Sequence, residues 1–197
     1  MSRVAIFIDG GHISKLAANE FGVPVDYGRL SAEIAATIDA RTVEPVELLR
    51  TLYYNCLPYQ SARPTPDEAK RYGASRKFHQ QLEKIPRYQV RLGRLAYRGQ
   101  DAKGRPIFQQ KRVDLMLGLD FALLAGGHQV QHAAILSGDS DVIPAVEVAK
   151  QEGVCTWHVH GPSTSKVSGL STYAQELWDV CDERIELTQA LMDRITR

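Results

Sequence analysis

The chain has 197 residues, 44% of them hydrophobic, which is enough to bury one substantial core. Its 24 Lys and Arg nearly balance its 23 Asp and Glu, so net charge alone excludes no class of partner. Cys56, Cys155 and Cys181 are odd in number and lack metal-ligand spacing, which argues against a disulfide framework or a zinc site. The first apolar run is short and interrupted by Asp9, unlike a signal peptide or a membrane span. We therefore expect a reducing, cytoplasmic setting and no membrane partner.

The charges are unevenly distributed along the chain. Residues 60–112 hold fourteen Lys and Arg against four acids, so this segment carries +10 and the remainder −9. Such segregation indicates a polyanionic partner beside an acidic site. The alternative is that these side chains only solvate the outer faces of a helix and a hairpin. We expect one domain over 1–197, with a basic insertion at about 60–112.

Hydrophobic periodicity predicts the elements of the first third of the chain. They are a strand over Arg3–Ile8, a helix over His12–Phe21, an amphipathic helix over Tyr27–Ile38 and a strand over 46–56.

The basic insertion is predicted to contain a helix and a hairpin. Thr65 is a plausible N-cap for a helix that runs to about Ile85 and is stopped by Pro86. Beyond it, alternating apolar residues and a turn at Gly99–Gly104 indicate a hairpin, whose loop carries Lys103 and Arg105. Tyr72 and Phe78 could stack on bases, although a place in the helix core explains them equally well.

The last part of the chain alternates strands and helices. The predicted elements are a nearly all-apolar helix over 113–124, strands over 133–136 and 154–159 with a helix over 143–152 between them, a helix containing Leu170 to Leu177, a short strand over 184–187 and a terminal helix. Helical crossovers between strands predict a parallel sheet in an α/β fold.

Four aspartates lie at the ends of these predicted strands and helices. Asp139 and Asp141 come just after the buried strand 133–136, Asp9 ends the first strand, and Asp114 begins the apolar helix. The carboxyl ends of parallel strands share one edge, and like charges crowded there favour a divalent cation that neutralises them. As alternatives, Asp114 and Asp141 could be helix N-caps, whereas Asp9 and Asp139 have little expected structural role.

The chemistry expected of such a site is phosphodiester hydrolysis. Divalent cations can activate water and stabilise a leaving oxygen, and Mg²⁺ or Mn²⁺ takes carboxylate oxygens and water as ligands. Asp120 lies six residues after Asp114, off its helical face, and is expected to pair with a basic side chain or to support the site. No P-loop and no G-x-G-x-x-G motif occurs, which argues against a nucleotide-driven or dinucleotide-dependent enzyme. Phosphoaspartate phosphatases need a second Asp two residues after the first, and here that position is Gly11.

These motifs resemble those of a known family. Ile8-Asp9-Gly10-Gly11, Lys111-Arg112-Val113-Asp114 and Ser137-Gly138-Asp139-Ser140-Asp141 together resemble the NYN domain, the PIN-like, LabA-type branch of metal-dependent ribonucleases. The resemblance implies a Rossmann-like α/β/α sandwich with a central, mostly parallel sheet, a Mg²⁺ or Mn²⁺ site and RNA, mostly single-stranded, as substrate. It also implies that Asp9, Asp114, Asp139 and Asp141 are the catalytic, metal-binding acids. A homodimer is compatible with the sequence.

Substrate contacts are expected from polar and basic side chains near these acids and in the insertion: His12, Ser137, Ser140, Lys111, Arg71, Arg76 and Lys77. His12 departs from the family pattern, which commonly has Asn three residues after the first Asp. Its ring could donate to a phosphate or a metal-bound water and titrates near neutrality; the alternative is a surface histidine at a helix start.

Two functions therefore remain open. The first is a nuclease, which the presence of all four acids favours. The second is a non-catalytic or regulatory nucleic-acid-binding module, which the replacement at His12 favours.

Overall fold

The protein is built on one seven-stranded sheet. A computed structural model describes residues 1–104 and 106–196, and its strands lie in the order β4-β3-β2-β1-β5-β6-β7. All neighbouring strands are parallel except β3 and β4. The predicted α/β class with a mostly parallel sheet is confirmed. The strands are β1 Ser2–Asp9, β2 Val46–Cys56, β3 Tyr88–Gln100, β4 Pro106–Lys111, β5 His132–Leu136, β6 Cys155–His160 and β7 Glu183–Glu186.

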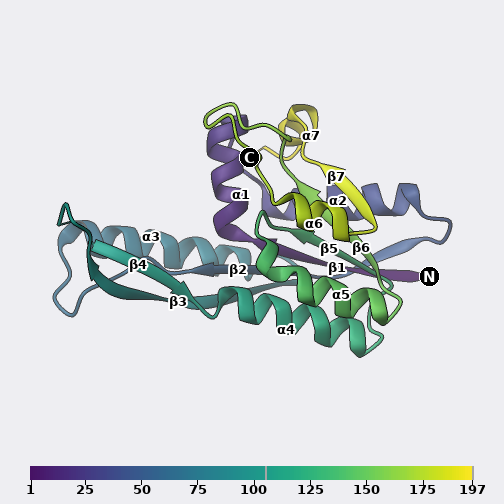
Figure 1. The fold of residues 1–197 in the computed structure, drawn as a ribbon, viewed down its shortest axis with the longest axis horizontal. Coiled ribbons are helices and arrows are strands. Elements are labelled where there is room, and N and C mark those ends of the chain that lie inside the picture. The colour runs from purple at the N-terminus through teal and green to yellow at the C-terminus, as the bar shows by residue number, and fades with distance from the viewer. Residues whose placement is uncertain (105, 197) are drawn as a thin grey trace.

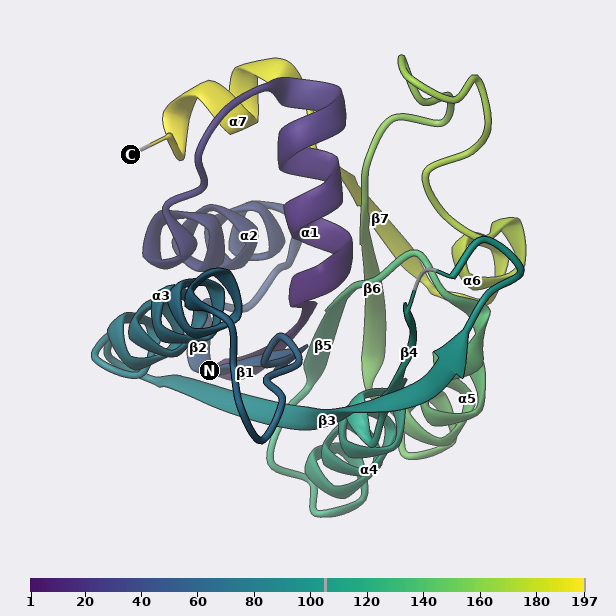
Figure 2. The ribbon, with the colours of Figure 1, turned by 90° about the vertical axis from the view of Figure 1, so that its left-hand side faces the viewer.

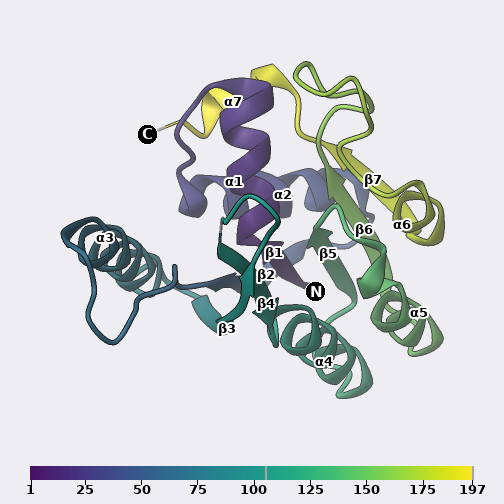
Figure 3. The ribbon, with the colours of Figure 1, turned by 60° about the vertical axis from the view of Figure 1, so that its left-hand side comes forward.

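Helices cover both faces of this sheet, as in PIN-like folds (Figure 1 and Figure 3). The first face carries α1 Gly10–Leu16, continued as a π-helix over Ala17–Phe21, with α2 Tyr27–Arg41, α3 Pro66–Leu82 and α7 Gln189–Arg194. The second face carries α4 Val113–Gly126, α5 Ile143–Gln151, which follows the 3-10 helix η2 Ser140–Val142, and α6 Gln175–Val180. Among the described helices, none is both long and apolar enough to cross a membrane.

Each face of the sheet has its own hydrophobic core, and β1 contributes to both. Val4, Ile6 and Ile8 pack under α1 and α2, whereas Ala5 and Phe7 pack under α4. Successive side chains of a strand point to opposite faces, so a strand covered on both sides reads as a continuous apolar run. This is why β1 and β5 were recognisable from the sequence.

The centre of the sheet is a topological switch point. The chain leaves β1 toward β2 on one side and later returns to β5 on its other side, with Ile8 level with Leu136. Ligands of open α/β sheets bind at the carboxyl ends of the strands on either side of such a point. Figure 2 views the molecule from the direction toward which the parallel strands run. Asp9 ends β1 at this edge, and the Ser137–Asp141 loop follows β5 there.

The basic segment contributes one helix and one long hairpin. Thr65 caps α3 in a reciprocal capping box with Glu68, as expected, and α3 ends at Leu82. The first half of β3, up to Gly93, pairs with β2, whereas its second half pairs only with β4. We call residues 94–100 and 106–111 the β3–β4 ribbon. It lies with α3 on the side of the molecule toward which the parallel strands run (Figure 1). Arg105, predicted for the hairpin loop, lies outside the described residues.

The predicted helix through Leu170 is wrong. The chain from 161 to 174 is irregular, and α6 begins only at Gln175. Ser165 Oγ accepts hydrogen bonds from the N–H groups of Val167 and Ser168, and Gly169 has φ +71°. Such local side-chain bonds and a left-handed residue compete with helix formation. Buried Glu20 holds this loop, because its carboxylate accepts from Ser165 Oγ and from the Lys166 N–H.

Candidate active site

Asp9 ends β1 and also caps helix α1. Its Oδ1 accepts hydrogen bonds from the backbone N–H groups of Gly11 (2.8 Å) and His12 (3.1 Å), so it is the N-cap of α1. The expectation that Asp9 has little structural role is therefore wrong. Burial raises the pKa of the Asp9 carboxyl, against the lowering effect of these two hydrogen bonds.

Asp139 also caps a helix, and Asp141 does not. Asp139 Oδ1 accepts from the Asp141 N–H (3.1 Å) and begins η2, whereas Val142 precedes α5. The expectations for these two residues are thus reversed, because a 3-10 turn precedes the α-helix. Ser137 is only 1% exposed, and its hydroxyl accepts from the Asp139 N–H. This burial does not support the expected contact of Ser137 with substrate.

Asp114 lies in the first turn of α4 and is not its cap. The cap position belongs to Arg112, whose φ is 75°. Desolvation, and then the charges of Asp139, Asp9 and Asp141, raise the pKa of the Asp114 carboxyl. Asp9, Asp139 and Asp141 therefore all lie within electrostatic range of Asp114, although the four acids come from three separate parts of the chain.

The donor set fits a hard divalent cation that keeps much of its water. Among the described residues, no three His, Cys, Asp or Glu side chains are close enough to hold one ion directly. Mg²⁺ is usually bound through one or two carboxylates, with water and substrate phosphate filling its other positions. Asp9 and Asp139 accept their capping hydrogen bonds through Oδ1. Among the described residues, these bonds leave the Oδ2 atom of each carboxylate unused. Those second oxygens are available to an ion.

Asp114→Asn should stabilise the metal-free protein and weaken its response to metal. A carboxyl with a raised pKa contributes stability at low pH that is lost as the pH rises through its folded-state pKa, so at neutral pH the charge of Asp114 is unfavourable. Melting temperatures measured from acid to neutral pH, with EDTA or with Mn²⁺, test this. Asp193→Asn, at an exposed position of α7, is the matched control. Equal Mn²⁺ stabilisation of parent and variant would contradict the assignment.

His12 does not lie as the sequence suggested. Its Nε2 is buried without a hydrogen-bond partner, and a Cβ added to Gly138 would lie 2.7 Å from its Nδ1. Burial, and then the charge of Lys15, lowers the pKa of His12 to about 4. The expectation that His12 titrates near neutrality is therefore wrong. The ring is a neutral spacer between α1 and the loop that carries Asp139.

Replacing His12 should therefore alter packing and leave the pH profile unchanged. Because the ring is neutral over the working range, neither His12→Asn nor His12→Phe should remove an inflection near neutral pH from a pH–rate profile. His12→Phe keeps the ring and should keep activity, whereas His12→Ala should cost about tenfold through a looser Gly138 loop. Loss of a neutral inflection in His12→Asn would show that the imidazole takes part in the reaction.

His158 is a supporting residue that the sequence reading did not single out. It is fully buried in β6, and its Nε2 lies 3.0 Å from the Ser137 carbonyl oxygen. Burial lowers the pKa of His158 to about 4, so the neutral ring donates Nε2–H to that carbonyl. It thereby fixes the start of the Ser137–Asp141 loop. A histidine at an inward position of a buried strand was the available signal.

Asp120 and the expected substrate-binding residues lie around this site. Asp120 accepts hydrogen bonds from Tyr54 Oη (2.9 Å) and Arg91 Nε (3.1 Å), so its predicted pairing with a basic side chain is confirmed. Ser140 begins η2, and exposed Lys111 ends β4. The remaining three, Arg71, Arg76 and Lys77, are exposed on α3, on the opposite face of the sheet from α4.

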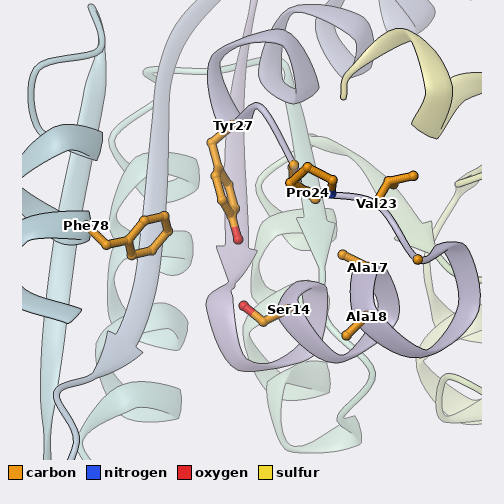
Figure 4. A pocket seen from close by; sticks show the side chains of 9 residues that line it. Ser14, Ala17, Ala18, Val23, Pro24, Tyr27 and Phe78 are labelled. Carbon is orange, nitrogen blue, oxygen red and sulfur yellow. The ribbon is translucent and has the colours of Figure 1, made fainter. Parts of the chain in front are cut away.

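Two surface hollows of similar size differ in chemistry. One, of about 510 Å³, lies between α4 and α5, and Asp114 and Asp141 are among its lining residues. The other, of about 520 Å³, lies between α1, α2 and α3 and is lined by residues such as Ser14, Tyr27 and Phe78 (Figure 4). It has no carboxylate, imidazole or thiol. Phe78 packs on Tyr27 and Tyr53, so the core explanation for Phe78 holds.

Comparison with models of protein families identifies the family of this chain. The model of the NYN domain matches residues 3–188, nearly the whole chain. The chain belongs to the NYN family. NYN domains form a PIN-like nuclease family, so nucleic acid is the substrate class of the family. No curated protein matches the chain.

Proposed function

We propose that this NYN protein is a ribonuclease that hydrolyses phosphodiester bonds with Mg²⁺ or Mn²⁺. The observation that carries the proposal is the position of the acids: Asp9 ends β1, Asp139 and Asp141 follow β5, and Asp114 begins α4. Desolvation, and then the charges of Asp139, Asp9 and Asp141, raise the pKa of Asp114. Four carboxylates gathered at the switch point are unfavourable in the free protein unless a cation compensates them. This is the arrangement expected of a site whose charge is completed by metal and phosphate.

Asp9, Asp114, Asp139 and Asp141 would hold the metal, one or two of them directly and the others through its bound water. When bound, the metal supplies a water of lowered pKa and stabilises the leaving oxygen. The chain's own contribution is to fix the carboxylates. Backbone N–H groups orient Asp9 and Asp139 through Oδ1, and His158 fixes the loop before Asp139. Lys111 lies three residues before Asp114, where its charge attracts a phosphate backbone.

The direct test is degradation of labelled single-stranded RNA with Mg²⁺, with Mn²⁺ and with EDTA. Cleavage that requires a divalent ion supports the proposal, whereas cleavage unaffected by EDTA contradicts it. The alternative is a binding module without hydrolysis. It is favoured by the replacement at His12 and by the absence, among the described residues, of three acids close enough to hold one ion. Binding of RNA without any cleavage would establish that alternative.

The exposed basic residues of α3 should contribute binding and little to chemistry. Replacing Arg71, Arg76 and Lys77 together by Gln should weaken RNA affinity and flatten its salt dependence, because each phosphate contact to a single strand contributes about 0.7 to the slope. Saturating turnover should change little, since these side chains lie on the far face from α4. Affinity measured over a salt series checks this, with exposed Arg50→Gln as the control. An unchanged slope would count against the proposal.

A further inference from the structure

Two aromatic rings of the β3–β4 ribbon contact each other and a third ring from outside the ribbon. Tyr97 and Phe108 are directly opposite in the antiparallel register, with ring centroids 5.9 Å apart. Tyr59, from the loop after β2, lies 5.0 Å from Phe108 and 6.1 Å from Tyr97. We call Tyr59, Tyr97 and Phe108 the ribbon aromatic cluster. It joins two segments that are distant in sequence.

The hydrophobic cores do not explain this cluster. None of its members belongs to either buried core or packs against one. Tyr97 is 47% exposed and Phe108 37% exposed. Aromatic rings offer a large flat surface, and rings left open to solvent in a group are typical of binding sites.

The ribbon that carries the cluster is strongly basic, which favours an anionic partner. Arg94 and Lys111 pair across the two strands on the opposite face of the ribbon from Tyr97 and Phe108, and neither has an acidic partner among the described residues. Like charges directly opposite in a strand pair are destabilising without a counter-charge. From Tyr88 to Arg112 the chain has seven Lys and Arg and a single acid. Arg94 also lines a hollow of about 360 Å³ together with Tyr59 and Tyr72.

The cluster lies on the same side of the sheet as the acids of α4. Alternate residues of a strand share a face, so Tyr97 shares its face with Arg91 and Leu95. Arg91 bonds Asp120 of α4, and Leu95 packs on the α4 core. Phe108 is six residues before Asp114, so the two are at most roughly 20 Å apart. A strand bound on the ribbon can therefore continue to the acids.

We propose that the ribbon aromatic cluster binds a single-stranded stretch of RNA next to the cleavage site, with Arg94 at its edge in the hollow that it shares with Tyr59. The rings stack on bases, and the positive charge of the ribbon attracts the phosphate backbone. A duplex would be disfavoured, since its bases are already stacked and paired. The inference rests on the proposed function for the choice of RNA and for the path to the acids.

The test is RNA binding in EDTA, where cleavage plays no part. The probes are a single-stranded oligouridylate, the same oligomer with abasic residues, and a duplex of equal length. Tyr97→Leu with Phe108→Leu removes the rings but keeps apolar strand residues, and Tyr97→Phe with Phe108→Tyr is the matched control. We expect the parent and the control to prefer the intact single strand at least tenfold over the abasic oligomer. The Leu variant should lose that preference and retain the salt dependence.

Several outcomes would overturn the inference. They are equal binding of abasic and intact RNA by the parent, preference of the parent for the duplex, or parent-like affinity in a Leu variant that melts normally. A Leu variant that changes only the oligomeric state would show that β4 pairs with a second copy and would also overturn it. Failure of cleavage with ring-dependent binding intact would contradict only the proposed nuclease. Metal-dependent cleavage without any effect of the rings would contradict only the ribbon site.

Discussion

Asp139→Asn is expected to reduce RNA hydrolysis by at least about a hundredfold while the protein stays folded. Asn is as good an N-cap as Asp, so the bond that Asp139 Oδ1 accepts from the Asp141 N–H can be kept. What is lost is the second carboxylate oxygen and the negative charge. Removing that charge also relieves Asp114, whose pKa it raises. Activity and stability should therefore move in opposite directions.

Single-turnover cleavage and melting curves, with Mn²⁺ and with EDTA, measure both effects on the same preparation. Asp193→Asn is again the control for loss of an exposed acid. Asp9→Asn should behave like Asp139→Asn, whereas Asp9→Ala should lose in addition about 1 kcal/mol of capping. A fully active Asp139→Asn variant, or a parent without any metal response, would mean that these acids do not form the site.

The strands could be predicted from the sequence because both faces of the sheet are covered. Runs such as 4–8 and 133–136 are apolar throughout, which fixes them as central strands whose carboxyl ends must meet. That alone predicted Asp9 and Asp139 at one edge. The helix predicted through Leu170 was wrong for the opposite reason. The apolar residues of the 161–174 segment mimic a helix period, but its conformation is set by Glu20, 145 residues away from Ser165.

The details of the site could not be predicted, because they depend on contacts between residues that are distant in sequence. The sequence shows that His12 follows Asp9 by three residues, but only the fold puts Gly138 against its ring and lowers its pKa. The support that His158 gives to Ser137 crosses from β6 to the residue after β5 and has no local signature. The ribbon aromatic cluster likewise needs the register of β3 on β4, which periodicity alone does not give.

Gly10→Ala should be the most damaging small substitution next to the site. A Cβ at position 10 would lie 2.7 Å from Tyr53 Cε1 and nearer still to the end of that ring. Tyr53 is fully buried and packs edge-on against Tyr27 and Phe78, so it has no room to retreat. Overpacking of this kind costs about 1–3 kcal/mol, and we expect the upper end of that range. The shift of α1 would also disturb the Asp9 cap and lower activity.

A double-mutant cycle distinguishes this clash from a general helix effect. Tyr53→Leu shortens the side chain that the new methyl group would meet, so the double variant Gly10→Ala/Tyr53→Leu should be more stable than the sum of the single changes predicts, by about 1 kcal/mol or more. Gly73→Ala, in open space on α3, is the control and should stabilise the protein by about 0.5–1 kcal/mol. Denaturant midpoints of the four proteins measure the coupling. Strict additivity would mean that the Tyr53 ring does not limit the first turn of α1, and the activity lost in Gly10→Ala would then need another cause than displacement of Asp9.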